Sequence, residues 1–532
     1  MSTFIKKVKE NKRLVFVFAV AFFLRLFYIG NIPGNRALYA DELFSGYESW
    51  SLLHFGYDYL GYHFPVYLPV WGGGMSIMQA LWQMPFILIF GLNSFALRLP
   101  AGILGCITVY CFYYICKKIK GEEFAIFAAF ILAVMPWHIM QSRWGLDCNY
   151  FVGFITISIA LLIKATENNR FISLALGFVG LTLYTYALPW AVMPLFVVGS
   201  FVYLLFQKKI EFNRHLIIGI VVLAVIATPL MIFLLVNYDI IPEIKTGIIS
   251  FPRLSHFRSD ELSLSPKAML KRFYDSLIMF VSQDDGRVSD VTPMFGLYYK
   301  FSNCFILIGI VACIIDFYNS CKKKVMDNSA FFLILFVCAV ILSGITEIFF
   351  SRINIIHIPM TYFLVLGLWY IKDLLGDKVL PVAVGVYICC AVAFLGYYVT
   401  YHDDNVAEAY IDGCESALDY VDSLYESGEA DEGATVQMLS GVGFTQTIFY
   451  TKYPTDKFIE DVNYADLEVT GGANIPLTLG KYDYTRQVIE GTALQYTPGD
   501  VYVCQNTDSE AIKFLQDNGL ELKYFTNIVV AH

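Results

Sequence analysis

An adjacent pair of carboxylates, Asp41 and Glu42, follows shortly after the first long apolar segment of the chain. If that segment crosses a bilayer, the pair lies near the lipid headgroups, where a carboxylate is not needed for anchoring and loses part of its hydration. A carboxylate pair at this depth suggests chemistry, such as general-base catalysis. The structural alternative is that Asp41 caps a short interfacial helix with Glu42 in its first turn. The pair alone leaves both interpretations open.

Three more charged residues lie at the ends of later apolar runs. Arg143 and Asp147 belong to the segment Gln141-Ser-Arg-Trp-Gly-Leu-Asp147, and Arg352 lies just before another apolar run. An arginine at a membrane surface can bind a lipid phosphate, but it can equally reach headgroups or form a structural pair. We therefore keep Arg143 and Arg352 as candidates for phosphate binding beside these structural roles.

The loop 237–300 contains a polar turn with Asp284, Asp285 and Arg287. For each of these charges a solvated turn is the simpler explanation. Loops this long in compact proteins are nevertheless often lids or binding elements, so the loop as a whole is a candidate for contact with an acceptor substrate.

The composition places the chain in the membrane. Of its 532 residues, 57% are hydrophobic and only 16% are charged, and the mean hydropathy is +0.57. Such values exclude an ordinary soluble domain. The first apolar segment, Leu14 to Gly30, follows a basic stretch that includes Lys6, Lys7 and Lys9. It is long enough to span, and no small-residue cleavage site follows, which predicts a retained signal anchor.

Loop charges decide the expected topology. The short run 75–90 contains Gln79, Gln83 and Pro85, and if it lies along the interface, the Lys-rich loops at 117–120, 208–214 and 322–324 all become cytoplasmic. If it crossed, these loops would face outward. We therefore predict a polytopic α-helical protein with a cytoplasmic N-terminus and about 11 spans. The expected spans are 14–30, 95–116, 123–140, 149–163, 171–187, 191–206, 216–236, 301–318, 330–346, 354–371 and 379–399.

The last 132 residues form a separate, acidic region. From Tyr401 on, the chain holds 23 acidic and 6 basic residues, a net charge of −17, which leaves +8 for the preceding 400 residues. This asymmetry favours a domain 401–532 outside the cytoplasm, beyond a membrane domain 1–400 with outer loops 31–94 and 237–300. The expected α/β elements are helices at 407–425, 445–453 and 509–518 and strands at 436–439, 501–504 and 522–530.

Metal and disulfide chemistry have weak support. Only Cys414 and Cys504 lie in the polar tail, where their spacing permits a disulfide but does not imply one. Most other cysteines fall in apolar runs and behave as small hydrophobic residues. No zinc-like Cys/His spacing occurs in the sequence.

The expected location limits the reaction. An enzyme at the outer membrane surface has no nucleotide triphosphates, so an activated sugar must be carried by a lipid such as a polyprenyl phosphate. Transfer from this donor breaks the bond between the anomeric carbon and a phosphate oxygen through an oxocarbenium-like state. The phosphate leaves without a proton but needs positive charge nearby, and the acceptor hydroxyl needs a base.

An ordered set of features resembles integral-membrane glycosyltransferases of the C-type fold. These features are the first span, the Asp41-Glu42 opening of an outer loop, a membrane-surface helix, the run Asn93 to Ala101 and a Ser-Arg-x-x-x-Asp ending at Asp147. The chain is most similar in this respect to family 39 protein mannosyltransferases and lipid A aminoarabinose transferases. The resemblance covers roughly residues 12–400, and an outer α/β tail matches the plan of bacterial members.

The resemblance implies roles for individual residues. Asp41 becomes the catalytic base of an inverting transfer, Glu42 its supporting or metal-linked neighbour, and Asp147 a second acidic residue that orders the site. His63 resembles the start of a His-Phe-Glu-Lys-Pro run in aminoarabinose transferases, but Pro65 follows Phe64 directly. A divalent metal is therefore optional, with Glu42, His54 and His63 as its candidate ligands, although such histidines are more often structural.

Two other functions stay open. A lipid-linked glycan flippase or transporter would place charges near the bilayer midplane and show repeated halves, and neither is visible in the sequence. A ligase or polymerase of surface glycans would share the polyprenyl-linked donor but not obviously the acidic pair. The expected location is the bacterial cell membrane, and the sequence identifies neither the sugar nor the acceptor, which can be protein, lipid or wall polymer.

Overall fold

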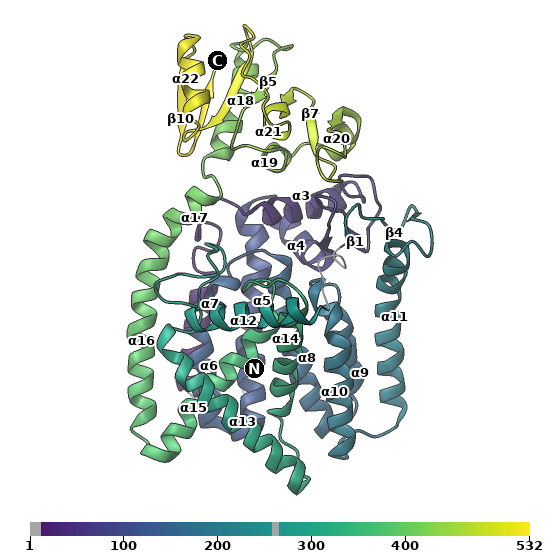
Figure 1. Ribbon diagram of the computed structural model, residues 1–532, viewed down its shortest axis with the longest axis vertical. Coiled ribbons are helices and arrows are strands. Elements are labelled where there is room, and N and C mark those ends of the chain that lie inside the picture. The colour runs from purple at the N-terminus through teal and green to yellow at the C-terminus, as the bar shows by residue number, and fades with distance from the viewer. Residues whose placement is uncertain (1–11, 258–264) are drawn as a thin grey trace. The chain divides into compact units, whose positions relative to one another are not determined.

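The computed structural model describes residues 12–257 and 265–532 (Figure 1). Lys6, Lys7 and Lys9 of the basic N-terminal stretch lie outside the described residues. The described chain divides into two compact units. The first comprises residues 12–29, 98–231 and 265–399, and the second comprises residues 30–97, 232–257 and 400–532.

The first unit is a helical bundle in which each expected apolar run forms helix. Its helices are α2 (Lys12–Leu26), α5 (Ser94–Lys120), α6 (Glu122–Ala133), α7 (Pro136–Gln141), α8 (Asp147–Glu167), α9 (Phe171–Thr182), α10 (Met193–Phe206), α11 (Arg214–Asn237), α12 (Pro266–Ser282), α13 (Asn303–Lys323), α14 (Ala330–Ile345), α15 (His357–Leu375) and α16 (Val379–Tyr397). The N-terminal end of α5 and the C-terminal end of α11 belong to the second unit.

Helix lengths bear on how many spans there are. Among the described residues, six helices are long and apolar enough to cross a bilayer, whereas α9, α10 and α14 are apolar but shorter. The predicted number of spans stays a prediction, because length alone does not decide which short helices cross. The expected span 123–140 is not one helix: α6 ends at Ala133, and Pro136 opens α7, since proline suits a first turn and disfavours the interior of a helix.

Two glycines let α13 and α15 pack at close range. A Cβ atom on Gly309 of α13 would overlap the backbone carbonyl of Phe363, and one on Gly367 of α15 would overlap that of Phe305. Small residues at such crossings bring helix backbones together, which strengthens van der Waals packing in a membrane environment where burial from water contributes little. This crossing holds together the part of the bundle that carries Arg352 and the segment before α15.

The second unit combines two loop regions with the C-terminal domain. Its helices and strands are α3 (Ala40–His54), β1 (Tyr67–Leu68), β2 (Met75–Ser76), α4 (Ile77–Phe90), β3 (Ile244–Lys245), β4 (Ser250–Phe251), α17 (Asp403–Ala409), α18 (Cys414–Ser427), β5 (Val436–Met438), α19 (Phe444–Tyr450), α20 (Thr455–Asp461), β6 (Val462–Tyr464), β7 (Pro476–Leu479), β8 (Tyr482–Asp483), α21 (Thr485–Val488), β9 (Val501–Gln505), α22 (Ser509–Asp517), β10 (Leu522–Phe525) and β11 (Ile528–Ala531).

A mixed sheet forms the C-terminal α/β domain. In the described residues its strand order is β10-β11-β9-β5-β8-β7-β6, with β5 parallel to β8 and β9 and the other pairs antiparallel. Leu515 of α22 packs on Tyr502, Cys504 and Val529. The helix α18 contacts β10 and β11. Successive side chains of each strand point to opposite faces of the sheet. The two helices appear beside this sheet in Figure 1.

The structure corrects two expected elements of this domain. The single strand expected at 522–530 is the hairpin β10–β11, with a turn at Thr526, whose φ is 46°. The single helix expected at 407–425 is divided into α17 and α18 near Gly413, whose φ is 101°. A Cβ atom there would also overlap the carbonyl of Phe525, so only glycine fits this break.

Candidate functional site

The acidic pair opens α3, and its two members have different environments. Tyr39 occupies the N-cap position, Asp41 is the second helical residue and Glu42 the third. The Glu42 side chain is fully buried, and its Oε2 accepts a hydrogen bond from the Tyr39 amide at 3.3 Å. Asp41 is only partly buried. Glu42 therefore contributes a capping hydrogen bond at this helix terminus, and both carboxylates add negative charge where the helix dipole favours anions.

Two glutamines of α4 hold α3 in place. Gln79 Nε2 donates to Ser45 Oγ at 2.6 Å, and Ser49 Oγ donates to Gln83 Oε1 at 3.0 Å. Gln83 Nε2 also donates to the Leu97 carbonyl at 3.1 Å. Both glutamines are buried, and the two hydrogen bonds of Gln83 satisfy its Oε1 and its Nε2, which avoids the cost of unsatisfied polar groups. The polar residues that make 75–90 a poor spanning helix thus fix the orientation of the helix that carries Asp41.

The C-terminal domain packs directly on α3 within the second unit. The Tyr47 hydroxyl donates to the Tyr453 carbonyl at 2.8 Å, and Thr455 Oγ1 donates to Ser51 Oγ at 2.8 Å. Gly46 lies so close to Phe449 that an added Cβ would approach its ring to 2.8 Å. The helix with the candidate base is therefore clamped between α4 and the α/β domain.

In the first unit, Arg143 and Asp147 lie on either side of a tight turn. The Arg143 guanidinium donates to the carbonyls of Leu24 and Phe27 at 3.0 and 2.8 Å, which closes the C-terminal end of α2. Asp147 begins α8 and is nearly buried. Arg143 therefore plays the structural role that the sequence allowed, through its hydrogen bonds to these backbone carbonyls.

A second segment of the first unit meets this turn through Asn354. Its Nδ2 donates to the Cys148 carbonyl at 2.9 Å, and its Oδ1 accepts a short hydrogen bond from Gln141. The structure therefore brings the segments that contain Asp147 and Arg352 together.

Arg352 and Arg287, which belongs to the polar turn of the long loop, contact the same aromatic ring, that of Phe349. The guanidinium carbon of Arg352 lies 4.6 Å from the Phe349 ring centroid, and that of Arg287 lies 3.2 Å from the same centroid. Asp285 Oδ2 accepts from the Phe350 amide at 2.9 Å. Two cations on one ring repel each other, so an anion between or beside them would stabilise the arrangement.

The same region contains a cavity of about 470 Å³. Its lining mixes acidic, basic and apolar side chains, namely Arg272, Asp275, Ser276, Ile278, Met279, Asp284, Asp285, Thr346, Glu347, Ile348 and Phe349. Burial and, to a smaller extent, the neighbouring Asp290 carboxylate raise the pKa of Asp285 to about 7, although hydrogen bonds from the Phe350 and Arg287 amides oppose this rise. The volume is that of a small-molecule pocket.

The sequence-predicted residues thus fall into two groups. Asp41, Glu42, His54 and His63 belong to the second unit. Arg143, Asp147, Asp284, Asp285, Arg287 and Arg352 belong to the first unit.

The candidate metal ligands do not form a cluster. Glu42 and His54 lie at opposite ends of α3, about 18 Å apart along a helix that rises about 1.5 Å per residue. His54 Nδ1 contacts the Trp50 carbonyl at 2.9 Å, and His63 Nδ1 contacts the Gly56 carbonyl at 3.2 Å. Within 12–257 and 265–532, no three His, Cys, Asp or Glu side chains group as a metal site. These residues therefore do not fit a shared metal ion.

Sequence reasoning missed several buried charged residues. Arg25, within the first expected span, is fully buried and donates to the carbonyls of Ala133 and Leu132 at 3.1 Å and to His138 Nδ1 at 3.2 Å. Arg98 is fully buried over the Trp144 ring at 4.8 Å. Arg25 lies in the last turn of α2 and Arg98 near the start of α5, so neither contradicts the expectation that charge avoids the bilayer midplane. An arginine inside an apolar run was the available signal.

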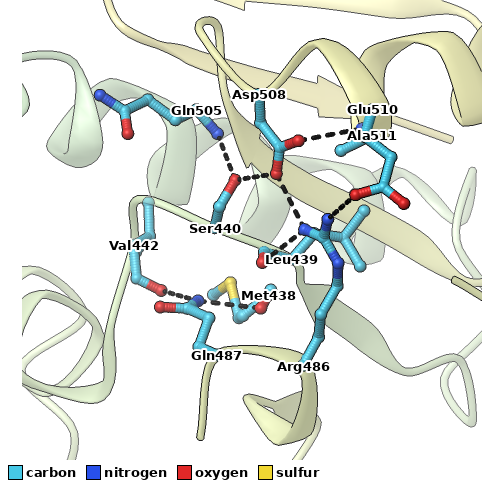
Figure 2. Close-up of polar contacts among 10 residues, drawn as sticks. All are labelled: Met438, Leu439, Ser440, Val442, Arg486, Gln487, Gln505, Asp508, Glu510 and Ala511. Carbon is cyan, nitrogen blue, oxygen red and sulfur yellow. Dashed lines mark hydrogen bonds and ion pairs between the residues drawn. The ribbon is translucent and has the colours of Figure 1, made fainter. Parts of the chain in front are cut away.

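The α/β domain holds a polar network that is internally satisfied. Figure 2 shows Arg486 donating to Asp508 and Glu510, while Asp508 accepts from Ser440 and the Ala511 amide. Because each charge has a partner, the network stabilises the domain rather than presenting a reactive group. Cys414 and Cys504 are both buried free thiols.

Comparisons with known proteins agree with this architecture. Residues 76–233 match the family model of dolichyl-phosphate-mannose-protein mannosyltransferases. The crystal structure of ArnT from Cupriavidus metallidurans bound to undecaprenyl phosphate matches with a TM-score of 0.59 and 13% identity, and it covers 98% of both chains. Its apo structure matches with a TM-score of 0.56 and 14% identity over 98% of both chains.

A weaker match is the apo oligosaccharyltransferase of Archaeoglobus fulgidus, with a TM-score of 0.46 and 13% identity over 85% of this chain and 64% of that one. No curated protein sequence matches the chain. The resemblance to C-type-fold glycosyltransferases and the predicted fold class are confirmed: the chain is a polytopic helical membrane protein with a small C-terminal α/β domain. The family match covers residues 76–233, and the ArnT matches, at 13–14% identity, show the fold.

Proposed function

We propose that this protein transfers a sugar from a polyprenyl phosphate to an acceptor hydroxyl at the outer face of a bacterial membrane. The observation that carries the proposal is the acidic pair at the start of α3 in a chain whose fold matches ArnT along its whole length. That ArnT structure contains undecaprenyl phosphate, which supports a lipid of the same chemical class here. The N-terminus is then cytoplasmic and the α/β domain outside.

Asp41 is the proposed general base. Its carboxylate accepts the proton of the acceptor hydroxyl as that oxygen bonds to the anomeric carbon, and the bond from this carbon to the phosphate oxygen breaks. The polyprenyl phosphate leaves as an anion, and a single displacement inverts the anomeric configuration. Partial exposure suits this role, because the base must reach substrate.

Glu42 is a positioning residue in this proposal. Its bond to the Tyr39 amide and its complete burial fix the first turn of α3, so the direction of the neighbouring Asp41 side chain is set before substrate binds. No step is assigned to a metal ion, since Glu42, His54 and His63 do not converge.

Arg352 and Arg287 of the first unit are proposed to bind an anionic group of a substrate. They share Phe349 in the wall of the 470 Å³ cavity, and a guanidinium pair suits bidentate binding of phosphate oxygens. Arg143 donates to two backbone carbonyls, and Arg352 donates to one, that of Glu347 at 3.5 Å. Asp284 and Asp285 of the same wall are the proposed acceptor contacts.

The proposal is tested by following the release of polyprenyl phosphate from purified protein in lipid nanodiscs supplied with polyprenyl-phosphate sugars. We expect Asp41→Asn to lower turnover by about 10²–10⁴-fold, the usual contribution of a general base. Asp147→Asn should cause a large but partial loss. Glu123→Gln, which removes an exposed carboxylate paired with Arg13, serves as the control and should be fully active.

Thermal unfolding of each variant separates lost chemistry from lost folding. Full turnover by Asp41→Asn would remove the assigned base. Wild-type protein that moves the intact lipid across the bilayer without releasing phosphate would instead identify a flippase.

A further inference from the structure

A second pair of carboxylates, Glu48 and Asp58, lies deep inside the second unit. Glu48 is on α3 and 1% exposed, and Asp58 is in the following loop and fully buried. Asp58 Oδ1 accepts from the amides of Leu60 and Tyr62 at 3.0 and 2.7 Å. Asp58 Oδ2 and both carboxylate oxygens of Glu48 have no hydrogen-bond partner. Buried carboxylate oxygens without partners are costly and need an explanation.

No side-chain cation neutralises this pair. Within the described residues, neither Glu48 nor Asp58 has a basic nitrogen within ion-pair distance. One cation close to this loop, Lys245, donates to the Leu60 carbonyl at 3.4 Å and lies 4.4 Å from the Tyr62 ring centroid. Its charge lowers the pKa of Asp58. A buried anion pair of this kind must take up a proton or another cation.

The electrostatics agree that the ionised pair lacks compensation. Burial raises the pKa of Glu48 well above its ordinary value, and the neighbouring Asp58 raises it further, opposed by the Tyr59 amide. Burial also raises the pKa of Asp58 to about 7, opposed by the Tyr62 and Leu60 amides and by Lys245.

The number of carboxylate oxygens without a partner distinguishes a shared proton from a bound metal ion. One proton shared between Glu48 and Asp58 Oδ2 satisfies one oxygen of each residue and leaves the other Glu48 oxygen without a hydrogen-bond partner. A divalent ion bound by both oxygens of Glu48 and by Asp58 Oδ2 satisfies all three, and it neutralises both charges. Bidentate glutamate and monodentate aspartate are ligands that hard divalent cations prefer.

We propose that Glu48 and Asp58 bind a divalent cation of the Ca²⁺ or Mg²⁺ type that fastens α3 to the loop 55–65. Backbone carbonyls or water complete its coordination. The ion is structural: it holds the helix that carries Asp41 in its first turn and takes no part in sugar transfer. The site also differs from the expected set Glu42, His54 and His63.

The test uses full-length protein in nanodiscs, stripped with EDTA and then titrated with Ca²⁺, Mg²⁺ or Tb³⁺. We expect about one ion per chain by elemental analysis and an unfolding temperature that rises by about 5 °C at a saturating ion concentration. Tb³⁺ emission, sensitised by aromatic neighbours such as Tyr59, should saturate and be displaced by Ca²⁺.

Glu48→Gln and Asp58→Asn should each weaken Tb³⁺ binding at least tenfold. Glu243→Gln is the matched control, because it removes an exposed carboxylate bound to Tyr62 beside the same loop, and it should bind like wild type. An unfolding temperature that neither EDTA nor Ca²⁺ nor Mg²⁺ changes would overturn the proposal, even if the variants do not fold. A Glu48→Gln variant that is as stable as wild type and binds Tb³⁺ equally would also overturn it in favour of a shared proton.

Discussion

Replacing Tyr47 by Phe tests whether the α/β domain clamps α3. The substitution keeps the buried ring and removes the hydroxyl that donates to the Tyr453 carbonyl at 2.8 Å and lies 3.3 Å from Thr455 Oγ1. Because Tyr47 is fully buried, water cannot replace the lost donor. The Tyr453 carbonyl therefore loses this partner in a site from which solvent is excluded.

The expected cost follows from these contacts. A neutral hydrogen bond contributes about 1 kcal/mol net, and a buried acceptor left without its donor raises the loss to about 1–3 kcal/mol. For a unit of this size each kcal/mol lowers the unfolding temperature by about 2–4 °C. We therefore expect Tyr47→Phe to unfold several degrees below wild type, with its packing otherwise retained.

The measurement is thermal unfolding of full-length protein, followed by intrinsic fluorescence, with Tyr524→Phe as the control. Tyr524 is 57% exposed on β10, so loss of its hydroxyl should change stability little. Thr455→Val combined with Tyr47→Phe should show a coupling of about 0.5–1 kcal/mol, because the two hydroxyls are in contact. Equal unfolding temperatures for Tyr47→Phe and wild type would refute the clamp.

Two further predictions concern the first unit. Gly309→Ala should prevent stable folding in detergent, because its Cβ would overlap the Phe363 carbonyl where α13 crosses α15. Gly385→Ala on α16, where a Cβ meets nothing within 4 Å, is the control and should unfold like wild type. Equal stability of the two variants would contradict the close crossing of α13 and α15. The pKa of Asp285 is about 7 in the folded protein and near 3.8 when unfolded, so the folded state binds more protons between these values, and its stability should fall as pH rises from about 4 to 7. Asp290→Asn should lower that pKa and flatten the fall in unfolding temperature with pH; an unchanged profile would show that the two carboxylates do not interact.

Much of the helical framework was predictable from local pattern. Each apolar run that the hydropathy marked contains a helix. In the α/β domain, apolar runs predicted the parallel strands β5 and β9, and amphipathic periodicity predicted α22, which lies between β9 and β10 in the chain. The α/β elements between Thr455 and Val488 were missed, because their strands are only two to four residues long. Such strands form through pairing with neighbours, which a single-sequence pattern does not record.

The sequence predicted which residues belong to the candidate site but not the different environments of Asp41 and Glu42. The sequence identified Asp41 and Glu42 as a pair, yet only the fold distinguishes a buried Glu42 bound to Tyr39 from a partly exposed Asp41. Glu48 and Asp58 are unremarkable in the sequence, where an aromatic loop with scattered charges suggests a surface. Their burial depends on packing of the loop against residues such as Phe458, which are distant in the chain.

By itself, the sequence determined that this chain is a membrane protein built from apolar helices with an acidic α/β tail, because hydropathy and periodicity act over neighbouring residues. Tertiary structure alone decided which carboxylates are exposed, which are buried, and which arginines share Phe349. These outcomes depend on contacts between segments that are far apart in the chain, and the free energy of a charged group is set by those contacts and by the water they exclude.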